Sequence, residues 1–372
     1  MKTISSLYIH FPFCKHLCNY CDFFKHKLEN TNQVDEFETF FSKQLDLHET
    51  YLKENGYKLE ALETLYIGGG TPSLWGERGA IYLESLFQNK RLSLKESCEF
   101  TVEVDPDAWN ESEVLRWQSI GVNRFSIGSQ AFSDKYISRM DRTHCLADVI
   151  KTVKYFSDRN LNYSVDLMLG LPDSETRDIE TELRELLRFE PKHLSVYILK
   201  TRANYPLKNN LPVEDFTRDE YLKVSAVLKS FNYKHYEVSN FAREGFESKH
   251  NLKYWEYQSV AGLGPNATGL IVNDTAAIRY QWKSISLGVT DEKLVGSSLL
   301  IEKLFLGLRF HNGFDFETLF PNENKSFVKL YKKWTESGYL ENYSSTHEIY
   351  LSALGYLMCD SLIDDVFKEI DF

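Results

Sequence analysis

The chain of 372 residues has no uninterrupted apolar run long enough to cross a bilayer and no hydrophobic signal segment. We therefore expect its six cysteines to stay reduced, as in a cytosol. Positive charge is also in deficit, since 43 Lys and Arg against 54 Asp and Glu give a formal net charge of −11. General nucleic-acid binding and broad adhesion to anionic lipid both depend on cationic surface, so this balance argues against them.

Half of the cysteines lie in one short stretch. Cys14, Cys18 and Cys21 have CxxxCxxC spacing directly after a short apolar run. Thiolates this close together can converge on one metal centre, and soft sulfur ligands favour zinc, copper(I) or an iron–sulfur cluster. A four-iron cluster normally takes four cysteines, so three would leave one iron open to a non-protein ligand.

A structural zinc site remains an alternative, although it needs a fourth ligand. That ligand would come from the nearby histidines His10, His16 or His26. The other cysteines are scattered along the chain, and we expect them to be buried small apolar residues. They are Cys98, Cys145 and Cys359.

The cysteine spacing, with Tyr20 before the third cysteine, resembles that of the radical S-adenosylmethionine (SAM) superfamily. The resemblance implies that the three cysteines hold a four-iron–four-sulfur (4Fe-4S) cluster and that SAM chelates the open iron. The longer segment YIHFPFCKHLCNYCDF resembles the coproporphyrinogen dehydrogenase group, and within it the HemW branch of heme chaperones.

Short apolar runs alternate with helical patterns over the first 240 residues. Strands are expected from Leu7 and over residues 64–67, 100–106, 124–130, 165–172 and 193–199, with one more at 234–238. Helical periodicity occupies residues 34–55, 111–119, 134–160, 176–189 and 217–230. Such alternation predicts parallel βαβ units, and six in succession predict an α/β fold with a partial (β/α)6-type TIM-like barrel.

The composition shifts twice after the barrel. We expect residues 1–240 to form the barrel with its cluster loop, and residues 241–296 to form a connecting region. Residues 297–372 read as a small C-terminal helical, winged-helix-like domain. Acidic residues close the chain, which argues against DNA binding by that domain and favours packing on the barrel or on a partner protein.

Chemistry in such barrels sits at the carboxyl ends of the strands. The glycines at 68–70, Glu103 and Gln130 fall at strand ends, whereas Asp166 lies nearer the middle of its run. On residues alone the glycine run is equally explained by a tight turn. The resemblance implies that Gly69 and Gly70 lie beside the SAM amino group and Tyr8 lies close to SAM and the cluster. It also implies SAM contacts from Glu103, Gln130, Arg142 and Asp166.

The segment HNLKYW begins at His250. From the residues alone, Tyr254 and Trp255 are best explained as core and His250 as a hydrogen-bonded loop residue. The segment is similar to the HNxxYW motif that HemW-like proteins use for heme, which makes His250 the expected axial ligand. Residues 261–270 resemble the family's GxGPGAHS segment, but Thr268 and Gly269 replace its His-Ser, so no role of that histidine carries over.

Two departures distinguish this chain from oxygen-independent coproporphyrinogen oxidases: Phe23 stands where they carry a fourth cysteine, and their N-terminal extension is missing. We therefore expect a chaperone that binds heme, a 4Fe-4S cluster and SAM and transfers heme to acceptor hemoproteins. The resemblance implies membrane-bound respiratory acceptors, a cytoplasmic protein peripheral to the inner membrane, and a homodimer. The alternatives are radical oxidative decarboxylation of porphyrinogen propionates and a zinc-stabilised barrel without radical chemistry.

Overall fold

Six parallel strands in chain order form the centre of the protein. The computed structural model describes residues 1–372 apart from 284–287, 346–347 and 371–372. The parallel strands are β1 (Lys2–Phe11), β4 (Tyr57–Gly69), β5 (Leu94–Val104), β6 (Arg124–Gln130), β7 (Tyr163–Leu169) and β8 (His193–Ile198). Each pairs in parallel with the next, which confirms the predicted partial barrel.

Three shorter strands extend this sheet at its edges. β11 (Ala261–Leu263) lies parallel to β1. At the other edge β10 (Asn240–Ala242) pairs antiparallel with β8, and β9 (Lys234–Glu237) pairs with β10. Over the described residues the edge strands β11 and β9 do not pair with each other, so the sheet is an open barrel.

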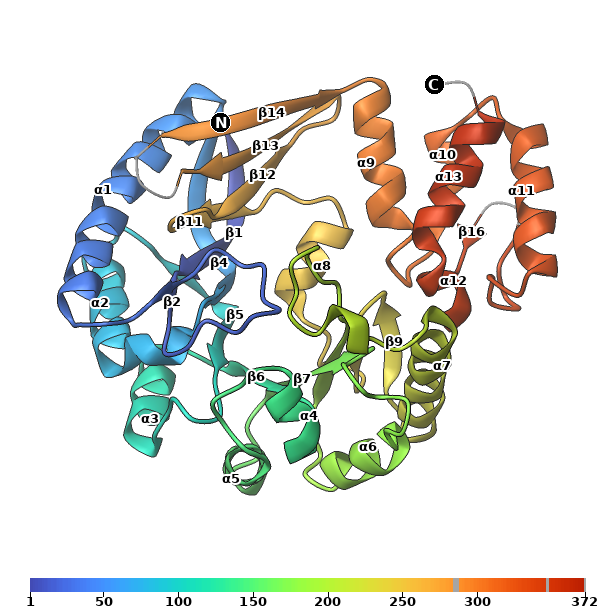
Figure 1. Ribbon diagram of the computed structural model, residues 1–372. Helices are drawn as coiled ribbons and strands as arrows, with labels where there is room; N and C mark the ends of the chain where they lie inside the picture. Colours follow the sequence, from blue (N-terminus) through green and yellow to red (C-terminus); the bar gives the residue numbers. More distant parts are fainter. Residues whose placement is uncertain (284–287, 346–347, 371–372) are drawn as a thin grey trace.

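Helices cover the outer face of this sheet (Figure 1). They are α1 (Asn32–Glu54), α2 (Gly76–Gln88), α3 (Glu111–Ser119), α4 (Asp134–Arg139), α5 (Leu146–Asp158), α6 (Ile179–Leu187) and α7 (Glu214–Ser230). The helix expected over 134–160 is divided in two, because Asp141 adopts a positive φ of 52° that ends α4. The intervening loop presents Arg142 and His144 to the barrel interior.

Side chains along the parallel strands alternate between two environments. On β1, Leu7, Ile9 and Phe11 are fully buried in the main hydrophobic core, whereas Tyr8 and His10 face the barrel interior. The same period of two places polar residues inside the barrel on every central strand. They include Thr64, Tyr66, Glu103, Arg124, Ser126, Asp166, His193 and Ser195. The apolar outer face stabilises the fold, and the polar inner face supplies the chemistry.

The region that the sequence predicted as a connection contains a second sheet. Helix α8 (Lys249–Trp255) is followed by β12 (Thr268–Val272), β13 (Ala276–Trp282) and β14 (Val289–Val295), which form an antiparallel sheet. Tyr280 fixes this sheet to α1, because its hydroxyl lies 2.7 Å from His48 Nε2. The second sheet therefore forms one wall above the barrel (Figure 1).

The C-terminal region is mainly helical, as expected, and its described residues also include one short two-stranded pair. Its elements are α9 (Ser297–Gly307), β15 (Phe314–Asp315), α10 (Phe316–Leu319), α11 (Asn324–Glu336), β16 (Glu348–Ile349), α12 (Ala353–Leu357) and α13 (Cys359–Glu369). A separate hydrophobic cluster around Trp334 and Leu362 holds it together. No helix within the described residues has the length and apolarity needed to cross a membrane.

The scattered cysteines differ in burial. Cys98 and Cys359 are buried, as expected. Cys145 is exposed, so that expectation was wrong for this residue. Its thiol lies 3.1 Å from the Asp148 carboxylate at the first turn of α5, where a polar partner compensates for the lack of apolar packing.

Candidate functional site

The three clustered cysteines lie on a loop that is closed at its base. β2 (Phe13–Cys14) pairs in parallel with β3 (His26–Lys27), and the Leu28 N–H donates to the Cys14 carbonyl at 2.9 Å. Cys14 is buried, and Cys18 and Cys21 are half-buried. All three line a cavity of ≈ 390 Å³, called here the cysteine cavity. Over the described residues, no group of three or more His, Cys, Asp or Glu side chains forms a site for a single metal ion.

The glycines after β4 allow this strand end to pack against the cysteine loop. The Gly70 N–H donates to the Phe11 carbonyl at 2.7 Å, and a Cβ on Gly70 would lie 2.5 Å from the Phe13 carbonyl oxygen. Gly69 has a φ of +118°, which disfavours other residues. Close backbone packing thus accounts for these glycines, while both also line the cysteine cavity.

Two carboxylic acids, Glu103 and Asp166, line the same cavity. Glu103 accepts hydrogen bonds from the Tyr66 hydroxyl at 3.0 Å and from the Gly69 N–H at 3.1 Å. Burial and the charge of Asp166 raise the pKa of Glu103 to about 7. Asp166 accepts from the Ser126 hydroxyl at 3.2 Å, and burial raises its pKa too. Although Asp166 is mid-strand, its inward direction brings it into the cavity.

Arg142 places a cation beside the cysteine loop. It forms an ion pair with Asp105, and its Nη1 lies 3.9 Å from Cys18 Sγ. Burial opposes ionisation of Asp105, but Arg142 and His144 outweigh it and lower the pKa of this carboxyl to about 2. Burial raises the pKa of the Cys18 thiol to about 11 against the opposing charge of Arg142. Gln130, with a φ of +66°, lines the same cavity at the end of β6.

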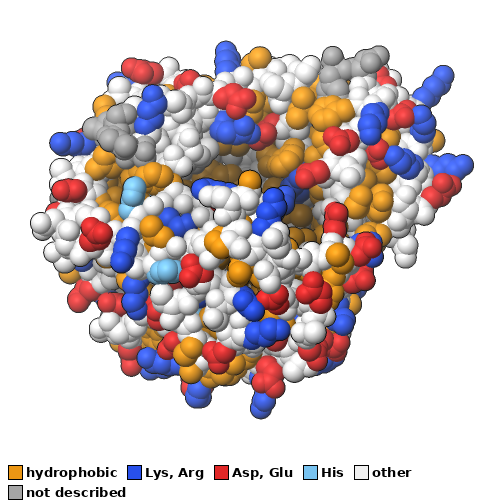
Figure 2. All heavy atoms as spheres, viewed as in Figure 1, with side chains coloured by type: hydrophobic (Ala, Val, Ile, Leu, Met, Phe, Trp, Pro, Cys, Tyr) orange, Lys and Arg blue, Asp and Glu red, His pale blue; other side chains and the backbone are white. Residues whose placement is uncertain are grey.

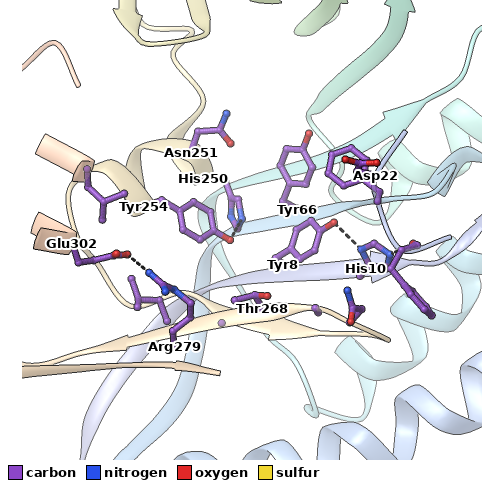
Figure 3. Close-up of a pocket in the computed structure, with 17 residues that line it drawn as sticks. Tyr8, His10, Asp22, Tyr66, His250, Asn251, Tyr254, Thr268, Arg279 and Glu302 are labelled. Atoms are coloured by element: carbon purple, nitrogen blue, oxygen red, sulfur yellow. Dashed lines mark hydrogen bonds and ion pairs between the residues drawn. The ribbon is translucent and has the colours of Figure 1, made fainter. Parts of the chain in front are cut away.

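A second cavity of ≈ 450 Å³, called here the aromatic cavity, opens beside the first. Figure 2 shows the hollowed face of the molecule, with hydrophobic side chains in its depth. Tyr8 and Tyr66 enter the aromatic cavity from β1 and β4, and His250 and Tyr254 enter from α8 (Figure 3). Tyr66 lines both cavities, as do Asp22 and Phe23 of the cysteine loop. Tyr8, expected beside SAM, lines the aromatic cavity.

His250 is buried in the wall of the aromatic cavity. Its Nδ1 lies 2.9 Å from the Thr64 hydroxyl, and its Nε2 lies 3.4 Å from the Tyr254 hydroxyl. Burial, with the charges of Arg124 and Lys253, lowers the pKa of His250 to about 3, so the imidazole is neutral. Hydroxyls both donate and accept, so either ring nitrogen can carry the proton.

His10, also in this cavity, differs from His250 in one respect. Its Nε2 lies 2.7 Å from the Phe24 carbonyl, which can only accept, so Nε2 carries the proton. Its Nδ1, 3.1 Å from the Tyr8 hydroxyl, is then the acceptor. The Phe24 carbonyl therefore fixes the tautomer of His10, whereas the two hydroxyl partners of His250 accommodate either tautomer, including the one in which Nε2 carries the lone pair.

Comparison with known proteins agrees with this geometry. The Radical SAM superfamily model matches residues 8–186. The heme chaperone HemW of Buchnera aphidicola subsp. Schizaphis graminum is 30% identical over 352 residues, covering 91% of this chain and 92% of that protein. HemW of Lactococcus lactis is 33% identical over 357 residues, with 89% and 88% coverage. The chain belongs to the HemW family of the radical SAM superfamily.

A solved structure shares the fold of this HemW-family chain. Coproporphyrinogen III oxidase (HemN) from Escherichia coli, described as a radical SAM enzyme, superposes with a TM-score of 0.79. Its sequence identity is 17%, and the match covers 99% of this chain and 91% of that one. This likeness establishes the α/β architecture, including the C-terminal region.

The cysteine cavity fits the cofactors of the radical SAM superfamily, a 4Fe-4S cluster and SAM. The three cysteines line one cavity together with Glu103 and Asp166, two carboxyl groups that accept hydrogen bonds. A 4Fe-4S cluster and SAM bound there would supply the chemistry of reductive cleavage of the SAM sulfonium. The protein's own residues close the loop through β2 and β3, keep Arg142 beside Cys18, and enclose the polar groups.

The sequence did not identify several residues of the aromatic cavity. Thr64, Tyr66, Arg279 and Glu302 all lie in or behind its wall. A period of two along β4 marks Thr64 and Tyr66 as sharing a face with Gly68, which is a usable signal. Arg279 carried no such signal, because its strand β13 was not predicted, and Glu302 lies on the helix α9, where the helical pattern gave no indication that its side chain meets a cavity.

Proposed function

We propose that this protein is a heme chaperone that binds heme in the aromatic cavity and transfers it to acceptor hemoproteins. The observation that carries this proposal is a neutral, buried imidazole, that of His250, in the wall of a cavity lined by aromatic rings. Neutral imidazole is the form that ligates heme iron, and aromatic rings pack against a flat macrocycle. The relatives named heme chaperones, which match most of this chain, support the same function.

In this proposal His250 Nε2 is the axial ligand of heme. A ligating histidine usually donates its other N–H to an outer partner that fixes the ring. Thr64, 2.9 Å from Nδ1, supplies that acceptor. The cavity volume of ≈ 450 Å³ lies within the usual range of about 300–1,000 Å³ for small-molecule sites.

In the same proposal the cysteine cavity binds the other two cofactors, the 4Fe-4S cluster and SAM. Cys14, Cys18 and Cys21 hold the 4Fe-4S cluster, and SAM lies beside it. The residues of this cavity proposed to contact SAM are Gly69, Gly70, Glu103, Gln130, Arg142 and Asp166. Tyr8 lines the adjoining aromatic cavity, and it is proposed to reach SAM past Tyr66, which lines both cavities and whose ring centroid is 6.1 Å from that of Tyr8. Carboxylates suit the ammonium and ribose hydroxyls of SAM, and the guanidinium suits its carboxylate.

The wider biology is part of the same proposal. The acceptors include membrane-bound respiratory hemoproteins, and the chaperone acts in the cytoplasm at the inner-membrane surface as a homodimer. Residues 1–240 form the radical SAM unit, 241–296 carry the heme motif, and 297–372 form a separate domain. The separate hydrophobic cluster of the C-terminal region supports the last boundary.

The decisive experiment is an anaerobic heme titration of reconstituted protein, followed by visible spectroscopy, with His250→Ala and His26→Ala as a pair. His26 is exposed in β3, outside the residues that line the aromatic cavity, so its variant is the control. We expect a saturable Soret band that His250→Ala weakens by about tenfold or more while the iron–sulfur band is kept.

Other outcomes would favour other functions. A cluster band without saturable heme binding would favour porphyrinogen oxidation, which turnover of coproporphyrinogen III by reduced protein would then establish. A colourless protein that holds stoichiometric zinc after reconstitution with iron and sulfide would favour a zinc-stabilised barrel.

A further inference from the structure

One ion pair at the end of the aromatic cavity has no role in the binding described so far. Arg279 on β13 and Glu302 on α9 both line the cavity, and Arg279 Nη2 lies 2.6 Å from Glu302 Oε1. The Arg279 Nη1 also lies 3.0 Å from Glu292 Oε2. Figure 3 shows Arg279 and Glu302 at one end of the cavity and Asp22 and His10 at the other, with His250 and the tyrosine rings between.

The lining of the cavity is uneven in charge. Of the described residues that line it, Arg279 is the only Arg or Lys. At the opposite end the acidic Asp22 is already paired with Arg202. A ligand that presents an apolar ring system to the tyrosines and a carboxylate at one edge therefore finds a lining cation only at the Arg279 end, where its carboxylate competes with Glu302 and Glu292.

We infer that Arg279 is the anchor for a carboxylate of the bound tetrapyrrole and exchanges Glu302 for a heme propionate on binding. The inference rests on the proposed heme function and names a recognition residue within that site. A guanidinium presents a planar fork of donors that fits a carboxylate, so the propionate can take the position of the Glu302 carboxylate.

The surroundings of the pair allow this exchange. The Arg279 side chain is 39% exposed, so it lies at the cavity edge and its donors are reachable. Glu292, on the neighbouring strand β14, is 62% exposed and can stay in place as the second partner. Displaced Glu302 belongs to α9, which continues into the C-terminal hydrophobic cluster through Leu304. Heme binding thus removes one contact between the second sheet and α9, the ion pair of Arg279 with Glu302.

The test compares heme with heme dimethyl ester, in which both propionates are blocked. Titrations use reconstituted full-length wild type, Arg279→Gln, Glu302→Gln and the control Arg218→Gln. Arg218 on α7 likewise forms two ion pairs with acidic side chains but does not line the cavity. Because a hydrogen bond to a charged group is lost, Arg279→Gln should weaken heme binding by about tenfold or more and leave ester binding unchanged.

The second variant should act in the opposite direction. Glu302→Gln removes the competitor for Arg279, so we expect it to tighten heme binding several-fold and leave ester binding unchanged. Both variants should keep the wild-type Soret position, because His250 still ligates iron. A ratio of heme to ester affinity that is the same in wild type and Arg279→Gln would overturn the anchor while leaving the chaperone function intact. No saturable heme binding by wild type would overturn both.

Discussion

The two cavities of this protein lie side by side but are assembled in different ways. The cysteine cavity is built from one closed loop and the carboxyl ends of neighbouring strands, and its lining is rich in sulfur and charge. The aromatic cavity combines side chains far apart in the chain, such as Tyr8 and His250, whose ring centroids are 6.5 Å apart. Residues close in sequence can be recognised by spacing, whereas residues joined by packing cannot.

The two cavities share part of their wall, so the comparison between them bears on function. Tyr66 lines both cavities and donates a hydrogen bond to Glu103 in one of them, while its ring centroid lies 5.3 Å from that of His250 in the other. If the cavities bind different cofactors, most substitutions should affect one cavity and spare the other.

The largest difference between the effects on the two cavities is expected for Cys18→Ala. Loss of one thiolate should abolish the cluster, because the thiolates hold it. Heme affinity should stay within about twofold, since no cysteine lines the aromatic cavity among the described residues. Iron and sulfide analysis and a heme titration measure the two effects.

Cys145→Ala is the matched control, because this exposed thiol does not line the cysteine cavity. It should keep full iron content. Unchanged iron in Cys18→Ala would refute the assignment of the cluster to this loop.

Gly70→Ala should disturb the cysteine cavity through the backbone. Its Cβ would lie 2.5 Å from the Phe13 carbonyl oxygen, next to Cys14. Relieving this contact should lower the free energy of unfolding by about 1–3 kcal/mol and reduce iron retention. Denaturant unfolding and iron analysis provide the readouts.

Gly128→Ala is the control for this substitution. Gly128 lines the same cavity, but a Cβ there would first meet the flexible Gln130 side chain at 3.3 Å. Equal losses of stability in the two variants would show that close backbone packing at Gly70 is not the cause.

Thr64→Val should affect the aromatic cavity alone. It removes the hydroxyl 2.9 Å from His250 Nδ1 at nearly constant volume. The ring loses its orienting partner, so heme affinity should fall by about 1 kcal/mol, less than for His250→Ala, with a shifted Soret band. The cluster content should not change.

Thr101→Val provides the matched control. Thr101 is a buried threonine on the neighbouring strand β5, and within the described part of the chain its hydroxyl has no hydrogen-bond partner. If both valine variants change heme affinity alike, the Thr64 hydroxyl has no orienting role.

The smallest effect is expected for Tyr66→Phe, a substitution in the wall shared by the two cavities, and it concerns the pH dependence of stability. In cofactor-free protein Glu103 has a pKa of about 7, above its ordinary 4.5, so the folded state retains a proton that the unfolded state releases. Its contribution to stability is therefore present below pH 4.5 and is lost as the pH rises towards 7, by at most about 1.4 kcal/mol per pH unit. Tyr66→Phe removes a donor to this carboxylate, so the loss should extend above pH 7.

Tyr254→Phe is the control for the pH experiment. It also removes a tyrosine hydroxyl, but that hydroxyl lies next to His250, whereas the Tyr66 hydroxyl donates to Glu103. Urea midpoints between pH 5 and 9 compare the three proteins. A pH profile of Tyr66→Phe that matches those of wild type and Tyr254→Phe would show that the Tyr66 hydroxyl does not influence Glu103.

Much of the barrel was predictable because period-two patterns and helical patterns are local. The six parallel strands and their order follow from such patterns, and α1 differs from its predicted range by only a few residues. β10 and β11 have three residues each, too few for any pattern to emerge. The second sheet was missed because the exposed residues of β14 show no apolar alternation.

The functional residues also fall into those that local patterns predict and those that only packing brings together. The sequence alone determined the cysteine loop and the polar inner face of the strands, since covalent spacing and strand period fix both. Only the tertiary structure decided that Tyr8 lies beside His250, that Arg142 pairs with Asp105, and that Arg279 meets Glu302. It also decided that His250 is neutral, because the pKa of a side chain depends on burial and neighbouring charges that distant segments supply.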